Sequence, residues 1–142
     1  MIVVETGPLY ASIDTDDADH DRCLQLLSDV PGPLVVPLPV VIETAYLVSK
    51  RLGAAKEADF LDSLSPASLS GRDITVDHLV ESDLIRAGQL CRTYADFPLG
   101  TVDACVIAVA ERLGVVDIAT LDRRHFSVVR PAHTEDFHLM PD

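Results

Sequence analysis

Apolar residues along this chain follow two patterns. Short, mostly apolar runs predict strands buried on both faces, and they cover residues 2–4, 34–36, 74–76 and 115–121, with short closing strands at 127–130 and 137–140. Apolar positions three or four residues apart predict amphipathic helices, which cover residues 23–30, 38–52, 54–64, 77–94 and 102–113. Alternating strands and helices predict an α/β fold, a three-layer α/β/α sandwich around a central, mainly parallel sheet.

Length and composition restrict the class of protein. The 142 residues contain no internal repeat, low-complexity tract or linker, so we expect one domain over residues 1–142. No stretch approaches the ~18 apolar residues of a membrane span, and the first residues lack the basic start of a signal peptide. We therefore expect a cytoplasmic protein with no membrane partner. Its three cysteines lack metal or disulfide spacing, which predicts free thiols.

The charge balance disfavours unaided contact with nucleic acid. Eleven basic residues stand against twenty-three acidic ones, a formal charge of −12. Such a chain repels phosphate unless a bound divalent cation or a basic partner reorganises its charge.

Four acids occupy places where ligands gather in parallel sheets. Glu5 and Asp122 directly follow predicted strands, and Asp103 lies in the first turn of a predicted helix. Glu43 interrupts a helix that is apolar nearly all round. Each alone has an ordinary explanation: Glu5 as a surface acid, Asp103 as a helix-start acid, Asp122 as a turn residue, and Glu43 as the partner of Arg51. Together they predict a site for a hard cation, Mg²⁺ or Mn²⁺.

A second acidic stretch, residues 14–19, has a different interpretation. Its Asp-x-Asp spacing is typical of a calcium loop, but the glycine and the acidic twelfth residue of such a loop are missing. We interpret it as a solvated loop ahead of a helix.

Four segments in register resemble the PIN-domain family and, within it, the VapC-type toxins of bacterial toxin–antitoxin pairs. They are residues 5–9, residues 39–43 with the embedded Glu43, residues 98–104 and residues 119–126. The resemblance covers essentially the whole chain. It implies a metal-dependent endoribonuclease whose acidic quartet falls on Glu5, Glu43, Asp103 and Asp122.

The resemblance also implies further roles and partners. Glu5, Asp103 and Asp122 would hold one or two Mg²⁺ or Mn²⁺ ions, with the hydroxyls of Thr6 and Thr120 beside them. The implied partners are an RNA substrate of the tRNA or rRNA class, a cognate antitoxin, and a second copy in a homodimer. The family pattern has aspartate at the first position, where this chain has Glu5, and the longer side chain predicts attenuated cleavage.

The only local excess of positive charge follows Asp122. Arg123, Arg124, His125 and Arg130 predict either phosphate contacts beside the metal site or a solvated loop.

Two other functions compete with the nuclease. A phosphoryl-accepting receiver domain needs a lysine at a late strand end, whereas Lys50 and Lys56 lie on or between helices. A catalytically weak PIN-like protein would act by binding RNA or antitoxin.

Overall fold

The computed structural model describes residues 1–142 and contains one five-stranded parallel sheet. The strands are β1 (Ile2–Val4), β2 (Leu34–Pro37), β3 (Ile74–Asp77), β4 (Asp117–Ala119) and β5 (His138–Met140). They lie side by side in the order β3-β2-β1-β4-β5, and every neighbouring pair is parallel. The expected α/β sandwich with a mainly parallel sheet is confirmed.

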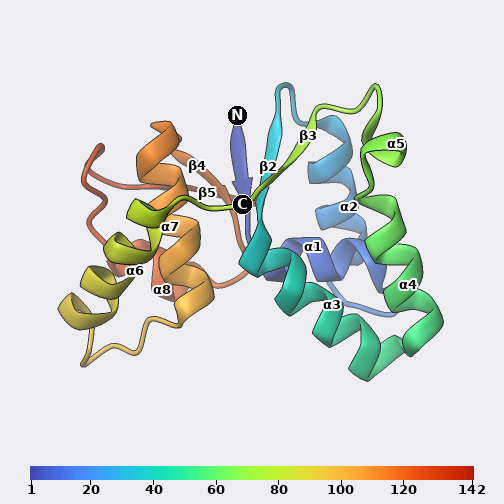
Figure 1. Ribbon diagram of the computed structural model, residues 1–142, viewed down its shortest axis with the longest axis horizontal. Coiled ribbons are helices and arrows are strands. Elements are labelled where there is room, and N and C mark those ends of the chain that lie inside the picture. Colours follow the sequence, from blue (N-terminus) through green and yellow to red (C-terminus); the bar gives the residue numbers. More distant parts are fainter.

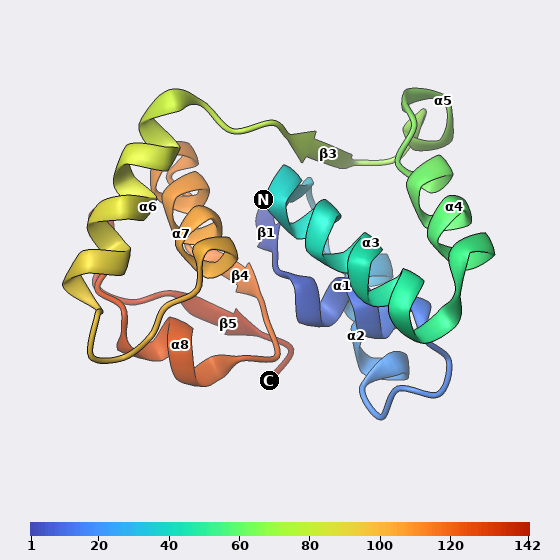
Figure 2. The ribbon, with the colours of Figure 1, turned by 60° about the horizontal axis from the view of Figure 1, so that its bottom comes forward.

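Eight helices flank this sheet. They are α1 (Thr6–Ile13), α2 (His20–Asp29), α3 (Leu38–Leu52), α4 (Ala54–Ser63), α5 (Pro66–Leu69), α6 (Glu81–Thr93), α7 (Thr101–Leu113) and α8 (Arg123–Val128). In Figure 1, α1 to α5 lie to the right of the central strands and α6 to α8 to the left. The pairs α3–α4 and α6–α7 run side by side in both ribbon views (Figure 2). None of the helices combines the length and the apolar character needed to cross a membrane.

The core explains why the central elements are rigid. Strand β1 is fully buried, as its apolar sequence predicts, and residues 104–110 of α7 are buried without interruption. A helix buried on all sides has little freedom to shift. Asp103 belongs to α7 and Glu5 is the residue after β1, so the core holds both backbones in place.

Three local predictions were wrong. Residues 127–130 do not form a strand, because the Asp122 side chain caps a short helix that covers Arg123–Val128. The helix expected from residue 77 begins at Glu81, because residue 77 ends β3 and Leu79 takes a positive φ of 63°. Between the expected helix over 54–64 and the expected strand over 74–76, where no element was predicted, the chain forms the short helix α5, capped by Ser65.

The three cysteines are free thiols, as predicted. Cys23 and Cys105 are buried and Cys91 is partly buried.

Candidate metal centre

Glu5 lies where β1 passes into α1. Its side chain caps α1: Oε2 accepts hydrogen bonds from the Gly7 amide at 3.0 Å and from Thr120 Oγ1 at 3.3 Å. A Cβ on residue 7 would lie only 3.2 Å from this oxygen, so glycine permits the close approach. Glu5 is 7% exposed, and burial raises its pKa to about 7, with nearby Asp103 adding to the rise.

Asp103 lies in the first turn of α7, where the helix dipole favours a carboxylate. Its Oδ2 lies 3.0 Å from His125 Nδ1. Burial is the main cause that raises its pKa, and the charges of Asp122 and Glu43 raise it further against the opposing effect of His125. Asp122 and Glu43 are therefore near enough to act on Asp103 by their charge, as Asp103 is near enough to act on Glu5.

Asp122 follows β4 and caps α8. One carboxylate oxygen accepts the backbone N–H of His125 at 3.2 Å, and the other lies 2.9 Å from His125 Nδ1. The Asp122 amide in turn donates to Thr120 Oγ1 at 2.9 Å. Thr120 therefore joins Glu5 to Asp122 across neighbouring strands β1 and β4.

Glu43 and Thr6 complete the sequence-predicted group. Glu43 is half-buried on α3 and forms no ion pair with Arg51, whose guanidinium lies over the Tyr10 ring. Thr6 is 3% exposed, and its Oγ1 has no hydrogen-bond partner in the protein. A buried hydroxyl without a partner beside Glu5 is the kind of group that a bound ion or its water satisfies.

The two predicted arginine contacts behave differently from the acids. Arg123 donates hydrogen bonds to the carbonyl oxygens of Leu139 and Pro141, at distances of 2.9 to 3.3 Å, and so is occupied with the C-terminal strand. Arg124 lies with its guanidinium carbon 5.1 Å from the centre of the Phe97 ring. Neither forms an ion pair with the four acids, and no other lysine or arginine does.

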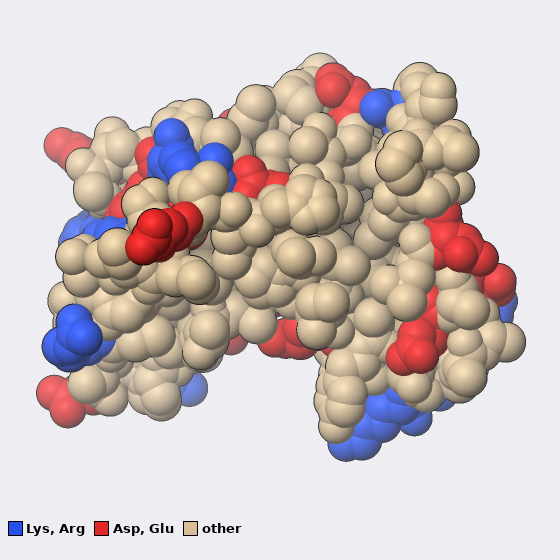
Figure 3. Space-filling view, in the orientation of Figure 1, with Lys and Arg blue, Asp and Glu red and all other residues tan.

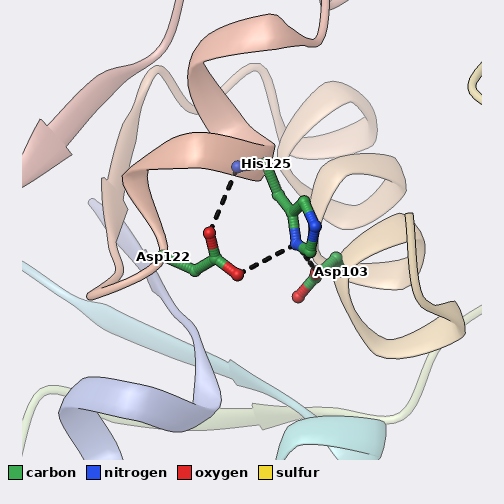
Figure 4. Close-up of side chains that lie close together, drawn as sticks. All are labelled: Asp103, Asp122 and His125. Atoms are coloured by element: carbon green, nitrogen blue, oxygen red, sulfur yellow. Dashed lines mark hydrogen bonds and ion pairs between the residues drawn. The ribbon is translucent and has the colours of Figure 1, made fainter. Parts of the chain in front are cut away.

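His125 is the site residue whose place the sequence analysis missed. We expected it among the phosphate contacts, but its ring lies between Asp103 and Asp122 (Figure 4). The signal for this was present: His125 is three residues after Asp122, the spacing at which a capping acid meets the first turn of its helix.

The donor set fits a divalent ion. Ligand atoms of Asp103, Asp122 and His125 all lie within 4.8 Å of one another. Glu5 and Glu43 lie outside this group of three, and neither forms an ion pair with a lysine or arginine. Oxygen-rich, uncompensated clusters of this kind suit Mg²⁺ and Mn²⁺.

Residues 2–130 match the PIN domain. The chain belongs to the PIN-domain family. It is 30% identical over 140 residues to ribonuclease VapC26 of Mycobacterium tuberculosis (strain ATCC 25618 / H37Rv), a match that covers 99% of this chain and all of that one. This PIN domain is therefore a homologue of the VapC ribonucleases.

Solved structures share the same PIN fold. VapC20 of Mycobacterium tuberculosis, described as a sarcin-ricin loop cleaving toxin, superposes with a TM-score of 0.73 at 21% identity, over 83% of this chain and 87% of that one. VapBC2 of Rickettsia felis, bound to a DNA fragment from its promoter, superposes with a TM-score of 0.69 at 17% identity. The match covers 99% of this chain and 100% of that one. FitAcB of Neisseria gonorrhoeae superposes with a TM-score of 0.58 at 17% identity, over 84% of this chain and 86% of that one.

Proposed function

We propose that this PIN domain is the toxin of a toxin–antitoxin pair and an endoribonuclease that hydrolyses RNA phosphodiester bonds with Mg²⁺ or Mn²⁺. The observation that carries the proposal is the cluster of Asp103, Asp122 and His125, whose carboxylates have no lysine or arginine partner, in a homologue of the VapC ribonucleases. Carboxylates crowded in this way are costly unless a cation joins them. The cytoplasm would be its compartment, and residues 1–142 would act as a single domain.

Glu5, Asp103 and Asp122 would hold the ion. A divalent ion held by carboxylates lowers the pKa of bound water and stabilises the leaving oxygen of a phosphodiester. The Thr120 hydroxyl donates to the carboxylate of Glu5 and accepts the backbone N–H of Asp122, so one side chain links both acids. Thr6 would offer its free hydroxyl to water or substrate at the same place.

Glu43 is suited to proton transfer. Its carboxylate is half-buried, unpaired, and close enough to raise the pKa of Asp103 by its charge. An acid in that position would orient the attacking water and accept its proton.

The RNA would be held through its phosphates beside the acids. On the face of the molecule drawn in Figure 3, lysine and arginine side chains lie in small, separate groups and form no continuous basic track. Arg124, next to the acids in sequence, would supply a contact to phosphate. Arg123 would do so only after leaving the carbonyls of Leu139 and Pro141. The substrate class, tRNA or rRNA, would be recognised mainly by shape.

A cognate antitoxin and a second copy of the chain are the proposed protein partners. The names FitAcB and VapBC2 each denote an assembly of two proteins, which supports a protein partner here. The charge of −12 favours a cationic inhibitor.

A weaker catalyst that acts by binding RNA or antitoxin is the second candidate. Glu5 favours it, because its oxygen is already held by Gly7 and Thr120 and its chain is one methylene longer than that of aspartate. A misplacement of about 1 Å can cost on the order of a hundredfold in rate. We expect Glu5→Asp to raise metal-dependent cleavage; equal and easily measured activity of both proteins would contradict attenuation.

Cleavage of a structured RNA tests the main proposal. Wild-type protein should cut the RNA with Mg²⁺ or Mn²⁺ and stop when the metal is chelated. Asp103→Asn should lower the rate by on the order of a thousandfold. Asp16→Asn is the matched control, since Asp16 is an exposed acid of the 14–19 loop. Full activity of Asp103→Asn, or equal loss in the control, would contradict the proposed site.

A further inference from the structure

The imidazole of His125 lies among the carboxylates of the proposed centre (Figure 4). We propose that His125 Nδ1 is a direct metal ligand together with Asp103 and Asp122, and that this nitrogen gives the site a preference for Mn²⁺ over Mg²⁺. The inference rests on the proposed function, because it needs a divalent ion at these acids. It adds a nitrogen donor to a site that the sequence predicts to be all oxygen.

The spacing of the three ligand atoms fits one ion. Nδ1 lies 3.0 Å from an oxygen of Asp103 and 2.9 Å from an oxygen of Asp122. Ligands about 2.1 Å from one octahedral ion lie about 3 Å from their neighbours. The side chains therefore already have the mutual distances of neighbouring ligands.

One contact of the His125 ring and one hydrogen bond of its backbone hold the side chain in this orientation. Phe97 meets it nearly at right angles, with ring centres 5.1 Å apart and an interplanar angle of 85°. The His125 backbone N–H is fixed by the cap from Asp122. Arg124 covers the Phe97 ring. A ligand fixed before the ion arrives loses little freedom on binding.

Other histidines of the chain make different contacts. His20 and His133 each meet a backbone carbonyl oxygen, of Ala11 and Val115. His138 does meet a carboxylate, Asp117, but only one, at an exposed position on the first residues of β4 and β5. Only His125 has a ring nitrogen within hydrogen-bond distance of two carboxylates.

The chemistry of the nitrogen decides the metal. Neutral imidazole with its proton on Nε2 offers the lone pair of Nδ1 to a cation. Mg²⁺ prefers oxygen ligands and keeps its water, whereas first-row transition ions accept imidazole readily. A site of carboxylates and one imidazole therefore binds Mn²⁺ more tightly than the same site without the ring.

Electron spin echo envelope modulation of Mn²⁺ bound to the full-length protein tests the ligand directly. We expect modulation from a directly coordinated ¹⁴N in wild type and in His138→Gln, the matched control. We expect none in His125→Phe, which keeps a ring against Phe97 but has no nitrogen. Bound Mn²⁺ without ¹⁴N coupling in the wild type would overturn the inference and leave the proposed nuclease intact. No Mn²⁺ binding at all would contradict both.

Affinities measured at one pH provide a second test. His125→Phe should weaken Mn²⁺ binding by roughly tenfold or more and Mg²⁺ binding by much less. His125→Asn should behave in the same way, which excludes a packing defect peculiar to phenylalanine. An equal loss for both ions would overturn the inference. Tighter binding of Mn²⁺ by the two His125 variants than by the wild type would also overturn it, because the imidazole would then compete with the ion for the carboxylates.

Discussion

Two pairs of acids occupy similar places in the fold. Asp77 ends a strand and Asp122 follows one, whereas Asp83 and Asp103 each lie in the first turn of a helix. Their surroundings differ. Arg112 donates to Asp77 at 2.7 Å and to Asp83 at 2.9 Å, and Asp83 is 2% exposed. These hydrogen bonds raise the pKa of the Arg112 guanidinium, and the one to Asp83 has the larger effect.

The acids around Asp103 receive no such arginine. Burial and like charge raise the pKa of both Glu5 and Asp103, with only His125 and local hydrogen bonds opposing the rise. Helix α7 belongs to both groups, because Asp103 is near its start and Arg112 is in its last turn. An acid therefore serves the fold where the fold supplies an arginine, and it keeps an uncompensated charge where the fold does not.

Removing the arginine should have the largest effect on stability. Arg112→Met leaves Asp83 buried and uncompensated, and we expect the free energy of unfolding to fall by about 3 kcal/mol. Chemical denaturation measures this. The double variant Arg112→Met/Asp83→Asn should recover part of the loss. An unchanged midpoint for Arg112→Met would show that the two groups of acids do not differ as described.

The pH dependence of stability should distinguish Glu5 from the paired acids. The folded pKa of about 7 lies above the ordinary 4.5, so the native state binds more protons than the unfolded state between these values. Stability of the metal-free protein therefore falls as pH rises from 4.5 to about 7, by about 3 kcal/mol in total. Glu5→Gln should flatten this part of the profile. A wild-type profile that rises over the same range would contradict the buried, unpaired carboxyl.

Neutralising one acid in each group should change stability in opposite directions. At pH 8 without metal, Asp103→Asn should stabilise the protein by roughly 1 kcal/mol, because it relieves burial of charge and crowding. Asp83→Asn should destabilise it by roughly 2 kcal/mol, because it weakens charged hydrogen bonds to Arg112. Thermal unfolding of the two variants side by side measures the difference. The same sign for both would remove the distinction.

The smallest effect is expected in the 14–19 loop. Asp14 and Asp17 accept hydrogen bonds from nearby amides, and Asp19 pairs with Arg22 of α2, so three of the four aspartates already have donors. Asp16→Asn should change the unfolding free energy by less than about 0.5 kcal/mol and leave metal affinity unchanged. A measurable loss of metal binding in this variant would place a site in the loop.

Much of this was predictable from the sequence. The apolar runs at 2–4 and 34–36 and the helical spacing over 38–52 and 102–113 predicted elements that the structure contains, because burial on one or both faces imposes the pattern. The rule that parallel strands end at one edge predicted a common place for Glu5 and Asp122, and the helix starts beside that edge added Glu43 and Asp103 to the prediction. Short elements such as α8 depend on a single cap and were missed.

The role of an individual charged side chain was harder to predict. Asp83 and Asp103 have similar sequence surroundings, and only the fold brings Arg112 to one of them across 29 residues. The place of His125 depends on the helix that Asp122 caps, and the commitment of Arg123 to Leu139 depends on the pairing of β4 with β5. The contacts of Arg112 with Asp83 and of Arg123 with Leu139 are distant in sequence and leave no local pattern, whereas the spacing of His125 from Asp122 is local.

The central claim, that the unpaired carboxylates hold a divalent ion and the arginine-paired ones do not, is tested most directly by crystallography with Mn²⁺. An anomalous difference map from crystals grown with manganese chloride locates the ion without reference to activity. We predict a peak between Asp103 and Asp122, next to Glu5, and none at Asp77 and Asp83. A map with no peak at the first group at saturating Mn²⁺, or with its peak at the second, would contradict the account.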